Sequence, residues 1–141
     1  MKYHFRVHKE KDGFSAQCIE LEGCLTEGDS MKELEANMAE ALNLYVFESE
    51  DSKDLAALPD QSIKTSAQIV EVSLDPEIAF SFLLRHHRIN NKLTQQQAAQ
   101  KMGFKNVYSY QRLEKKCNAT IELIAKVKKL FPKFSIDMAL A

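Results

Sequence analysis

The hydrophobic pattern of this chain changes its period at Asp75-Pro76. Before that point the chain contains segments in which apolar and polar residues alternate, as over residues 3–8, which is the pattern of a half-buried strand. After it, apolar residues recur at helical spacing. Pro76 disfavours helical geometry at Asp75 and is itself well suited to the first position of a helix. A chain of 141 residues with this change of pattern is predicted to form two domains. Their expected bounds are residues 1–74 and 76–141.

The first domain is expected to mix strands and a helix. Ser30 and Glu33 have the spacing of a capping box, and the apolar residues after them recur every three or four positions, which predicts an amphipathic helix over 31–48. An Asp-Gly turn at 11–13 joins two strands, and the polar stretch 48–54 is expected to be a loop. The expected strands are residues 3–8, a second one carrying Phe14, Ala16 and Cys18, a third within 21–26 that a turn at 27–29 closes, and a fourth over 67–73.

The second domain is expected to contain only helices. Thr94 and Gln97 form a second capping box, and Gly103 ends the short helix that this box opens. The expected helices run to about residue 90, through Met102, over 106–115, from the cap Thr120 to Pro132, and in a final short helix after Ser135. In the fourth of these, the residues expected to face inward are Ile121, Ile124, Val127, Leu130 and Phe131. The predicted fold class is α+β, with a small three- to four-stranded sheet carrying a helix on one face, followed by an all-α domain.

Charge divides at the same boundary. The formal net charge is −1, but residues 1–76 carry 7 basic and 16 acidic side chains, whereas residues 77–141 carry 12 basic and 4 acidic ones. The two parts therefore hold about −9 and +8. Such asymmetry between the two parts of a chain suggests a nucleic-acid partner for one of them.

The cysteines and the amino terminus favour a reducing compartment. The chain has three cysteines, Cys18, Cys24 and Cys117, and no secretory signal precedes the first strand. We therefore expect a cytoplasmic protein. No apolar run reaches the length of a membrane span, so no membrane partner is expected. His86-His87 has no partner at metal-ligand spacing, and we expect no metal site and no cofactor.

The run from Leu93 to Phe104 has the chemistry of two helices joined by a tight turn. The small Ala98 and Ala99 allow close helix approach, and Gly103 permits the turn. The polar and aromatic stretch that follows would present side chains to base edges in a major groove, while lysines suit phosphates. The expected DNA contacts are Thr94, Gln95, Lys105, Asn106, Tyr108, Ser109, Gln111, Arg112 and Lys115.

These residues resemble the Xre/Cro-type helix-turn-helix family, through "LTQQQAAQKMGF", "YQRLE" and "TIELIAKVKKLF" over residues 93–131. The resemblance implies a dimer that binds a two-fold symmetric operator. The stretch between Gly103 and Leu113-Glu114 is one residue longer than the usual pattern, which shifts the base-reading positions by one. The alternative is an inert four-helix bundle with a basic, solvated face.

The first domain resembles the HicB antitoxin domain, through "GFSAQCIELEGCLTEGDSMKELEANMAEAL" over residues 13–42. Family members often have prolines where this chain has Ile19 and Glu22. The resemblance implies a truncated RNase H-like fold and a partner, a HicA-like toxin, which is a small basic protein that cleaves messenger RNA. The expected toxin contacts are Glu20, Asp29, Glu33, Glu40 and Glu48. The alternative is that these carboxylates only solvate the surface.

Catalysis is not expected. A nuclease of this fold would need carboxylates converging on metal ions, but the inner strand face is predicted to carry Tyr3, Phe5, Val7, Phe14, Ala16 and Cys18. His4 and His8 share a strand face and are expected to be exposed polar surface. The sequence therefore predicts an antitoxin that also represses its own operon. The competing hypotheses are a solitary repressor whose first domain binds a ligand or oligomerises, and an RNA-processing enzyme.

Overall fold

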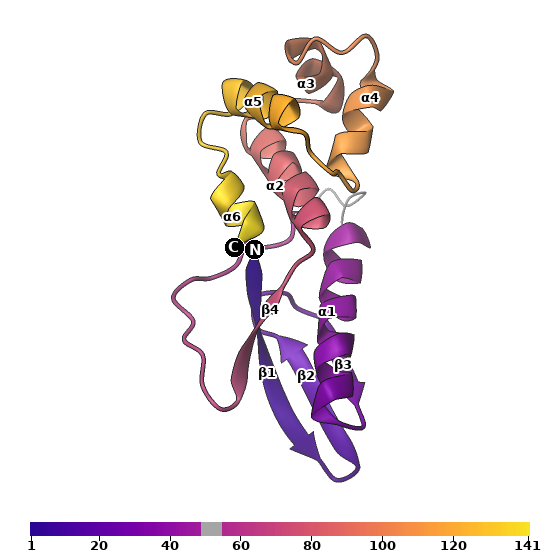
Figure 1. Cartoon of the computed structure of the whole chain (residues 1–141), viewed down its shortest axis with the longest axis vertical. Coiled ribbons are helices and arrows are strands. Elements are labelled where there is room, and N and C mark those ends of the chain that lie inside the picture. Colours follow the sequence, from indigo (N-terminus) through magenta and orange to yellow (C-terminus); the bar gives the residue numbers. More distant parts are fainter. Residues whose placement is uncertain (49–54) are drawn as a thin grey trace. The chain divides into compact units, whose positions relative to one another are not determined.

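The computed structural model describes residues 1–48 and 55–141, except the side chain of Glu48. The chain divides into two compact units, Met1–Leu74 and Asp75–Ala141. The fold is α+β, with a four-stranded antiparallel sheet and six α-helices among the described residues (Figure 1). The predicted loop over 48–54 and the predicted toxin contact of Glu48 lie outside the described residues and side chains.

The first unit is a sheet with one long helix against it. The strand order is β3-β2-β1-β4, with every neighbouring pair antiparallel. The long central strand β1 pairs with both β2 and β4, so Phe5 lies opposite Cys18 on one side and Val70 on the other. The elements are β1 (Lys2–Glu10), β2 (Gly13–Cys18), β3 (Leu25–Gly28), α1 (Met31–Glu48) and β4 (Ile69–Ser73).

The core of this unit lies between the sheet and α1. The predicted helix over 31–48 is confirmed at both ends, and its buried residues follow helical spacing. Tyr3 and Phe5 of β1 and Ala16 and Cys18 of β2 are buried as expected, whereas Val7 and Phe14 are half-buried. The buried residues of α1 are Leu34, Met38, Leu42 and Val46.

The third strand differs from its prediction at both ends. It begins at Leu25 because Leu21–Cys24 forms a turn, in which Cys24 N–H donates to the Leu21 carbonyl at 3.2 Å and Gly23 has φ +84°. It continues to Gly28, which pairs with Phe14. A Cβ on Gly28 would lie 2.7 Å from the backbone nitrogen of Leu34. Glycine therefore lets the end of β3 pass close to the first turn of α1.

His4 is buried, contrary to the prediction of an exposed strand histidine. Its Nδ1 lies 2.6 Å from Oε1 of Glu20, and its backbone N–H donates to Oε2 of the same carboxylate at 3.0 Å. Glu20 also accepts a hydrogen bond from the backbone N–H of Asp60 at 3.3 Å. A buried imidazole needs a polar partner, and the turn after β2 supplies the one that sequence spacing did not indicate.

The second unit contains five α-helices and a short 3₁₀ turn among its described residues. The elements are α2 (Pro76–Asn90), α3 (Gln95–Lys101), α4 (Val107–Gln111), the 3₁₀ turn η2 (Arg112–Glu114), α5 (Ile121–Leu130) and α6 (Ile136–Leu140). The predicted caps Thr94, Thr120 and Ser135 each accept a hydrogen bond from a backbone N–H. The single helix predicted over 106–115 is instead α4 followed by η2.

Aromatic rings join α2 to the carboxyl-terminal part of this unit. Phe80 meets Phe134 edge to face with ring centroids 5.3 Å apart, and His87 lies 5.8 Å from Phe131 and 5.5 Å from Phe134. The prediction that Ile121 faces inward is wrong, because 87% of this residue is exposed. Side chains lean toward the helix amino terminus, so the first residue of α5 projects beyond the helix.

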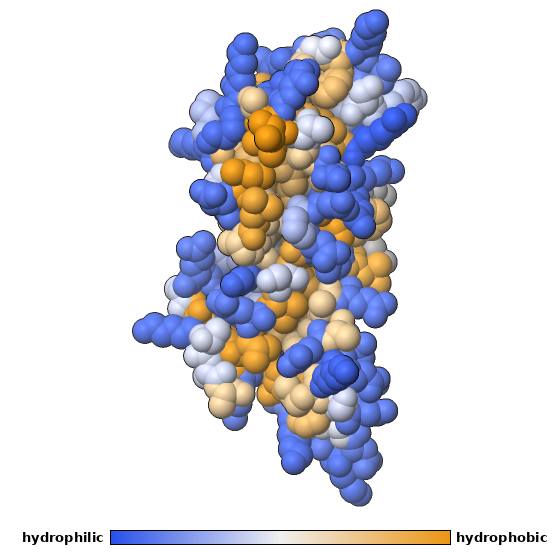
Figure 2. Space-filling view, in the orientation of Figure 1, coloured by the Kyte–Doolittle hydropathy of each residue, from blue (hydrophilic) through white to orange (hydrophobic). Residues whose placement is uncertain are grey.

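Polar and charged side chains cover most of the surface in view, with smaller apolar areas between them (Figure 2). Among the described residues, no helix combines the length and apolar character needed to cross a bilayer.

The helical unit should lose stability at mildly acidic pH through His87. Burial, followed by the charges of His86 and Lys128, lowers the pKa of His87 below its usual value of 6.5. The folded state therefore binds a proton at His87 more weakly than the unfolded state does. The contribution of neutral His87 to the free energy of unfolding is fully present above pH 6.5 and is lost as the pH falls below that value. We expect His87→Phe to reduce this loss, measured as the helical melting temperature between pH 7.5 and 5.5.

The control is His8→Phe, which removes an exposed histidine of the other unit. An equal pH dependence in the wild-type chain and His87→Phe would contradict the assignment.

Candidate functional site

The segment from Thr94 to Asn106 contains α3 and the sharp turn that leads into α4. Thr94 accepts a hydrogen bond from the N–H of Gln97, whose side chain accepts one in return from Thr94. Gly103 follows α3 with φ +79°, a left-handed geometry that glycine adopts without strain. Asn106 then caps α4 by accepting from Ser109 N–H at 3.0 Å. These local bonds set where each helix begins and how the chain turns between them.

A buried carboxylate ties four segments of this unit together. The Glu114 side chain is 3% exposed and pairs with Arg88 of α2, whose Nε and second guanidinium nitrogen lie 2.5 and 3.2 Å from the two carboxylate oxygens. The Tyr110 hydroxyl donates to Oε1 of Glu114 at 2.8 Å, and Nε2 of Gln95 donates to Oε2 at 2.8 Å. Burial, with the nearby carboxylate, raises the pKa of Tyr110, so it stays a hydrogen-bond donor.

The network continues outward through two glutamines. Gln95 donates to Glu114 with its amide nitrogen, and its amide oxygen accepts a hydrogen bond from Nε2 of Gln111 at 3.0 Å. Gln95 and Gln111 are both half-buried. The start of α3 is therefore joined to the end of α4 by side chains that were predicted to contact DNA.

The other predicted DNA contacts fall into two groups. The side chains of Thr94 and Asn106 serve as helix caps, and the Ser109 hydroxyl donates to Asn106. By contrast, Tyr108 is 68% exposed and Arg112 is exposed. Residues four apart lie on one side of a helix, so Tyr108 of α4 and Arg112, which caps the end of α4 and begins η2, lie on the same side. Lys105 and Lys115 are also exposed.

The sequence did not predict that Arg88 and Glu114 form a buried ion pair. A signal was available, since Glu114 is the single acidic residue between Glu77 and Glu122 in a strongly basic stretch. A lone carboxylate among cations is well placed to be a buried ion-pair partner.

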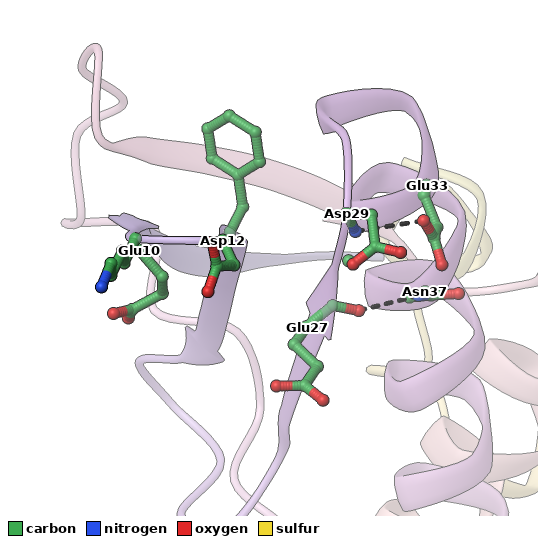
Figure 3. Close-up of a pocket in the computed structure, with 9 residues that line it drawn as sticks. Glu10, Asp12, Glu27, Asp29, Glu33 and Asn37 are labelled. Atoms are coloured by element: carbon green, nitrogen blue, oxygen red, sulfur yellow. Dashed lines mark hydrogen bonds between the residues drawn. The ribbon is translucent and has the colours of Figure 1, made fainter.

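The first unit carries an acidic groove of about 680 Å³. Three parts of the chain line it: the β1–β2 hairpin, the end of β3 with its following turn, and the first turns of α1 (Figure 3). Asn37 donates to the Glu27 carbonyl at 2.8 Å, and Glu33 accepts from Asp29 N–H at 3.0 Å, which joins β3 to α1. The lining residues are Glu10, Lys11, Asp12, Phe14, Glu27, Gly28, Asp29, Glu33 and Asn37.

Charge in this groove is almost entirely negative. Five of its nine lining residues are carboxylates, and Lys11 is the one cation among them. Like charges held together in a concavity create a potential that attracts cations. The groove can therefore accept a basic side chain or segment.

The predicted toxin contacts are not all on this surface. Asp29 and Glu33 line the groove, and Glu40 is exposed on α1 but outside the groove lining. Glu20 must be corrected, because its side chain is only 3% exposed and its oxygens bond to His4 and Asp60. The Glu20 carboxylate therefore makes its contacts inside the first unit and not on its surface.

The structure adds Glu10, Asp12 and Glu27 to the acidic surface. The hairpin brings the first two of these to the same side as Glu27, a proximity set by strand pairing. Residue spacing in the sequence does not reveal that Glu10 and Asp12 lie near Glu27, because this depends on the register between the strands.

Other groupings of ligand-type side chains are sparse. Within residues 1–48 and 55–141, no set of three His, Cys, Asp or Glu side chains is arranged to hold a metal ion.

No protein-family model matches the chain, and comparison with curated proteins finds no similar sequence. The functional argument for this chain therefore rests on its own motifs, charges and contacts.

Removing the buried carboxylate should strongly destabilise the helical unit. Glu114→Ala leaves Arg88 without its partner and Tyr110 and Gln95 without their acceptor, and breaking a buried pair in this way costs about 3–5 kcal/mol. Urea unfolding followed by helical circular dichroism measures this loss. The matched control is Glu122→Ala, whose carboxylate is 84% exposed and should change stability by less than about 0.5 kcal/mol. Similar effects of the two substitutions would contradict a central role for Glu114.

Proposed function

We propose that this chain is the antitoxin of a type II toxin–antitoxin pair. Its first unit binds and inhibits a HicA-like, messenger-RNA-cleaving toxin, and its second unit binds operator DNA as a homo-oligomer and represses the operon. The observation that supports this proposal most directly is the opposite net charge of the two compact units. Met1–Leu74 has 7 basic and 15 acidic residues, a net −8, whereas Asp75–Ala141 has 12 basic and 5 acidic ones, a net +7.

The DNA-binding half of the proposal is supported by the geometry around Gly103. We interpret α3, the turn and α4 as a helix-turn-helix, in which α4 with η2 enters the major groove. Tyr108 of α4 and Arg112 of η2 are both exposed, as base-reading side chains must be. An arginine can pair with guanine through two hydrogen bonds, and a tyrosine ring can pack on a thymine methyl group.

Phosphate contacts would come from exposed lysines at the edges of α4. Lys101 and Lys105 precede α4, and Lys115 and Lys116 follow η2. Lys116 lies 3.5 Å from Glu77, an exposed pair of the kind that contributes little to stability. Phosphate contacts position the protein on the duplex without specifying sequence.

The toxin-binding half of the proposal is supported by the acidic groove and the strand order. The order strand-strand-strand-helix-strand is the one expected from the HicB resemblance. A ribonuclease that binds RNA must present cations, and the groove holds five carboxylates that attract the same cations. An acidic surface of this kind speeds association with a basic partner and competes with its RNA.

Arg112 and Lys105 should affect DNA binding differently. Because Arg112 is assigned to a base, Arg112→Ala should cost about 1–3 kcal/mol on the operator and relax the sequence preference at one position per half-site. Lys105→Ala should weaken binding to all sequences alike and reduce the salt slope by about one. Fluorescence anisotropy with operator and unrelated duplexes at several salt concentrations measures both effects.

The control is Lys126→Ala, which removes an exposed cation of α5 that lies beside Glu122. Equal loss on both duplexes for Arg112→Ala would contradict its assignment to a base.

Reversing charge in the groove should release the toxin. With the full chain, Asp12→Lys combined with Glu27→Lys replaces two groove carboxylates by cations, and we expect at least tenfold weaker inhibition, about 1.4 kcal/mol. The assay is RNA cleavage by a small, basic, HicA-like ribonuclease, titrated with the chain. The matched control makes the same charge change in the other unit, Glu122→Lys with Asp137→Lys.

An unchanged inhibition by the groove variant would refute the groove as the toxin surface. A wild-type chain that binds DNA but inhibits no such ribonuclease would instead support the competing function, a solitary repressor.

A further inference from the structure

The amide of Gln111 is held in one orientation by a chain of hydrogen bonds that starts at a buried charge. Glu114 is paired with Arg88 and, as a carboxylate, can only accept hydrogen bonds. Gln95 must therefore turn its amide nitrogen toward Glu114, as the 2.8 Å contact shows. This orientation places the Gln95 oxygen on the opposite side, where it accepts from Gln111 at 3.0 Å.

Reversing the Gln111 amide would break this series of hydrogen bonds. A reversed amide would bring two oxygens together, and Gln95 cannot reverse in response without placing its own oxygen against Glu114. Burial of Glu114 makes that arrangement costly, since an unpaired buried acceptor loses its hydration without compensation. Gln111 therefore keeps one N–H on Gln95. The amide oxygen of Gln111 and its second N–H are not used by Gln95. The oxygen has no hydrogen-bond partner in the described part of the chain.

We propose that Gln95 makes Gln111 a reader of adenine that rejects guanine at one position in each half-site. This inference rests on the proposed binding of α4 in the major groove. Adenine offers an N6 donor and an N7 acceptor, which match the remaining oxygen and N–H of Gln111, whereas guanine offers two acceptors, N7 and O6. A free glutamine could rotate its amide to donate to either purine. Gln95 is thus a positioning residue, and Gln111 is the residue that touches the base.

The selection experiment uses the full-length chain and a randomised double-stranded DNA library, with sequencing of the bound fraction. The relevant position is the one whose preference changes in Gln111→Met. There the wild type should favour adenine over guanine by about fivefold or more, the range of one good bidentate contact. Gln95→Met keeps the side-chain length but removes both hydrogen bonds, and we expect its adenine-to-guanine ratio to fall below about twofold, with other positions unchanged.

The matched control is Gln96→Met, an exposed neighbour outside the network, which should keep the wild-type ratio. Melting temperatures of all variants are measured first. The wild type supplies a second test that needs neither DNA nor a variant: the side-chain N–H protons of Gln111 should include one that exchanges with solvent more slowly than the side-chain N–H protons of exposed Gln96.

Three results would overturn the inference: an unchanged adenine-to-guanine ratio in folded Gln95→Met, a guanine preference in the wild type, or Gln111 side-chain N–H protons that both exchange with solvent as fast as those of Gln96. The absence of any enriched sequence with the wild-type chain is a different result, because it rejects the proposed DNA-binding function itself.

Discussion

The ion pair of Arg88 with Glu114 is the interaction on which the helical unit depends. It joins α2 to η2 in a place where water is largely absent, since the two side chains are 12% and 3% exposed. Burying two charges is favourable only when further hydrogen bonds satisfy the remaining lone pairs. Tyr110 and Gln95 provide those bonds, and in doing so they fix α3 and α4 against the same carboxylate.

This arrangement separates stability from recognition on neighbouring residues. Tyr110 and Glu114 face inward, whereas Tyr108 and Arg112 of the same short segment face outward. In the proposed function, the inner pair holds α4 at a fixed angle and the outer pair reads DNA. Gln111 stands between these roles, because it is half-buried and bonded to the network through Gln95.

Carboxylates of the first unit are divided in a similar way. Glu20 is buried and organises His4 and the Asp60 backbone, while Asp29 and Glu33 lie at the acidic groove. Net charge alone does not distinguish these uses. A carboxylate contributes to a surface potential only where it remains exposed, so the −8 of this unit overstates what a partner meets.

Local patterns in the sequence by themselves determined most of the elements, because caps, turns and periodicity depend on residues only a few positions apart. Thr94, Thr120 and the helix over 31–48 were predicted correctly for this reason. Tertiary structure alone decided which charges are buried and which side chains meet. Glu20 finds His4 across 16 positions and Arg88 finds Glu114 across 26; the groove needs three separate segments. Such encounters depend on strand register and helix packing, which set the distance between residues far apart in the chain.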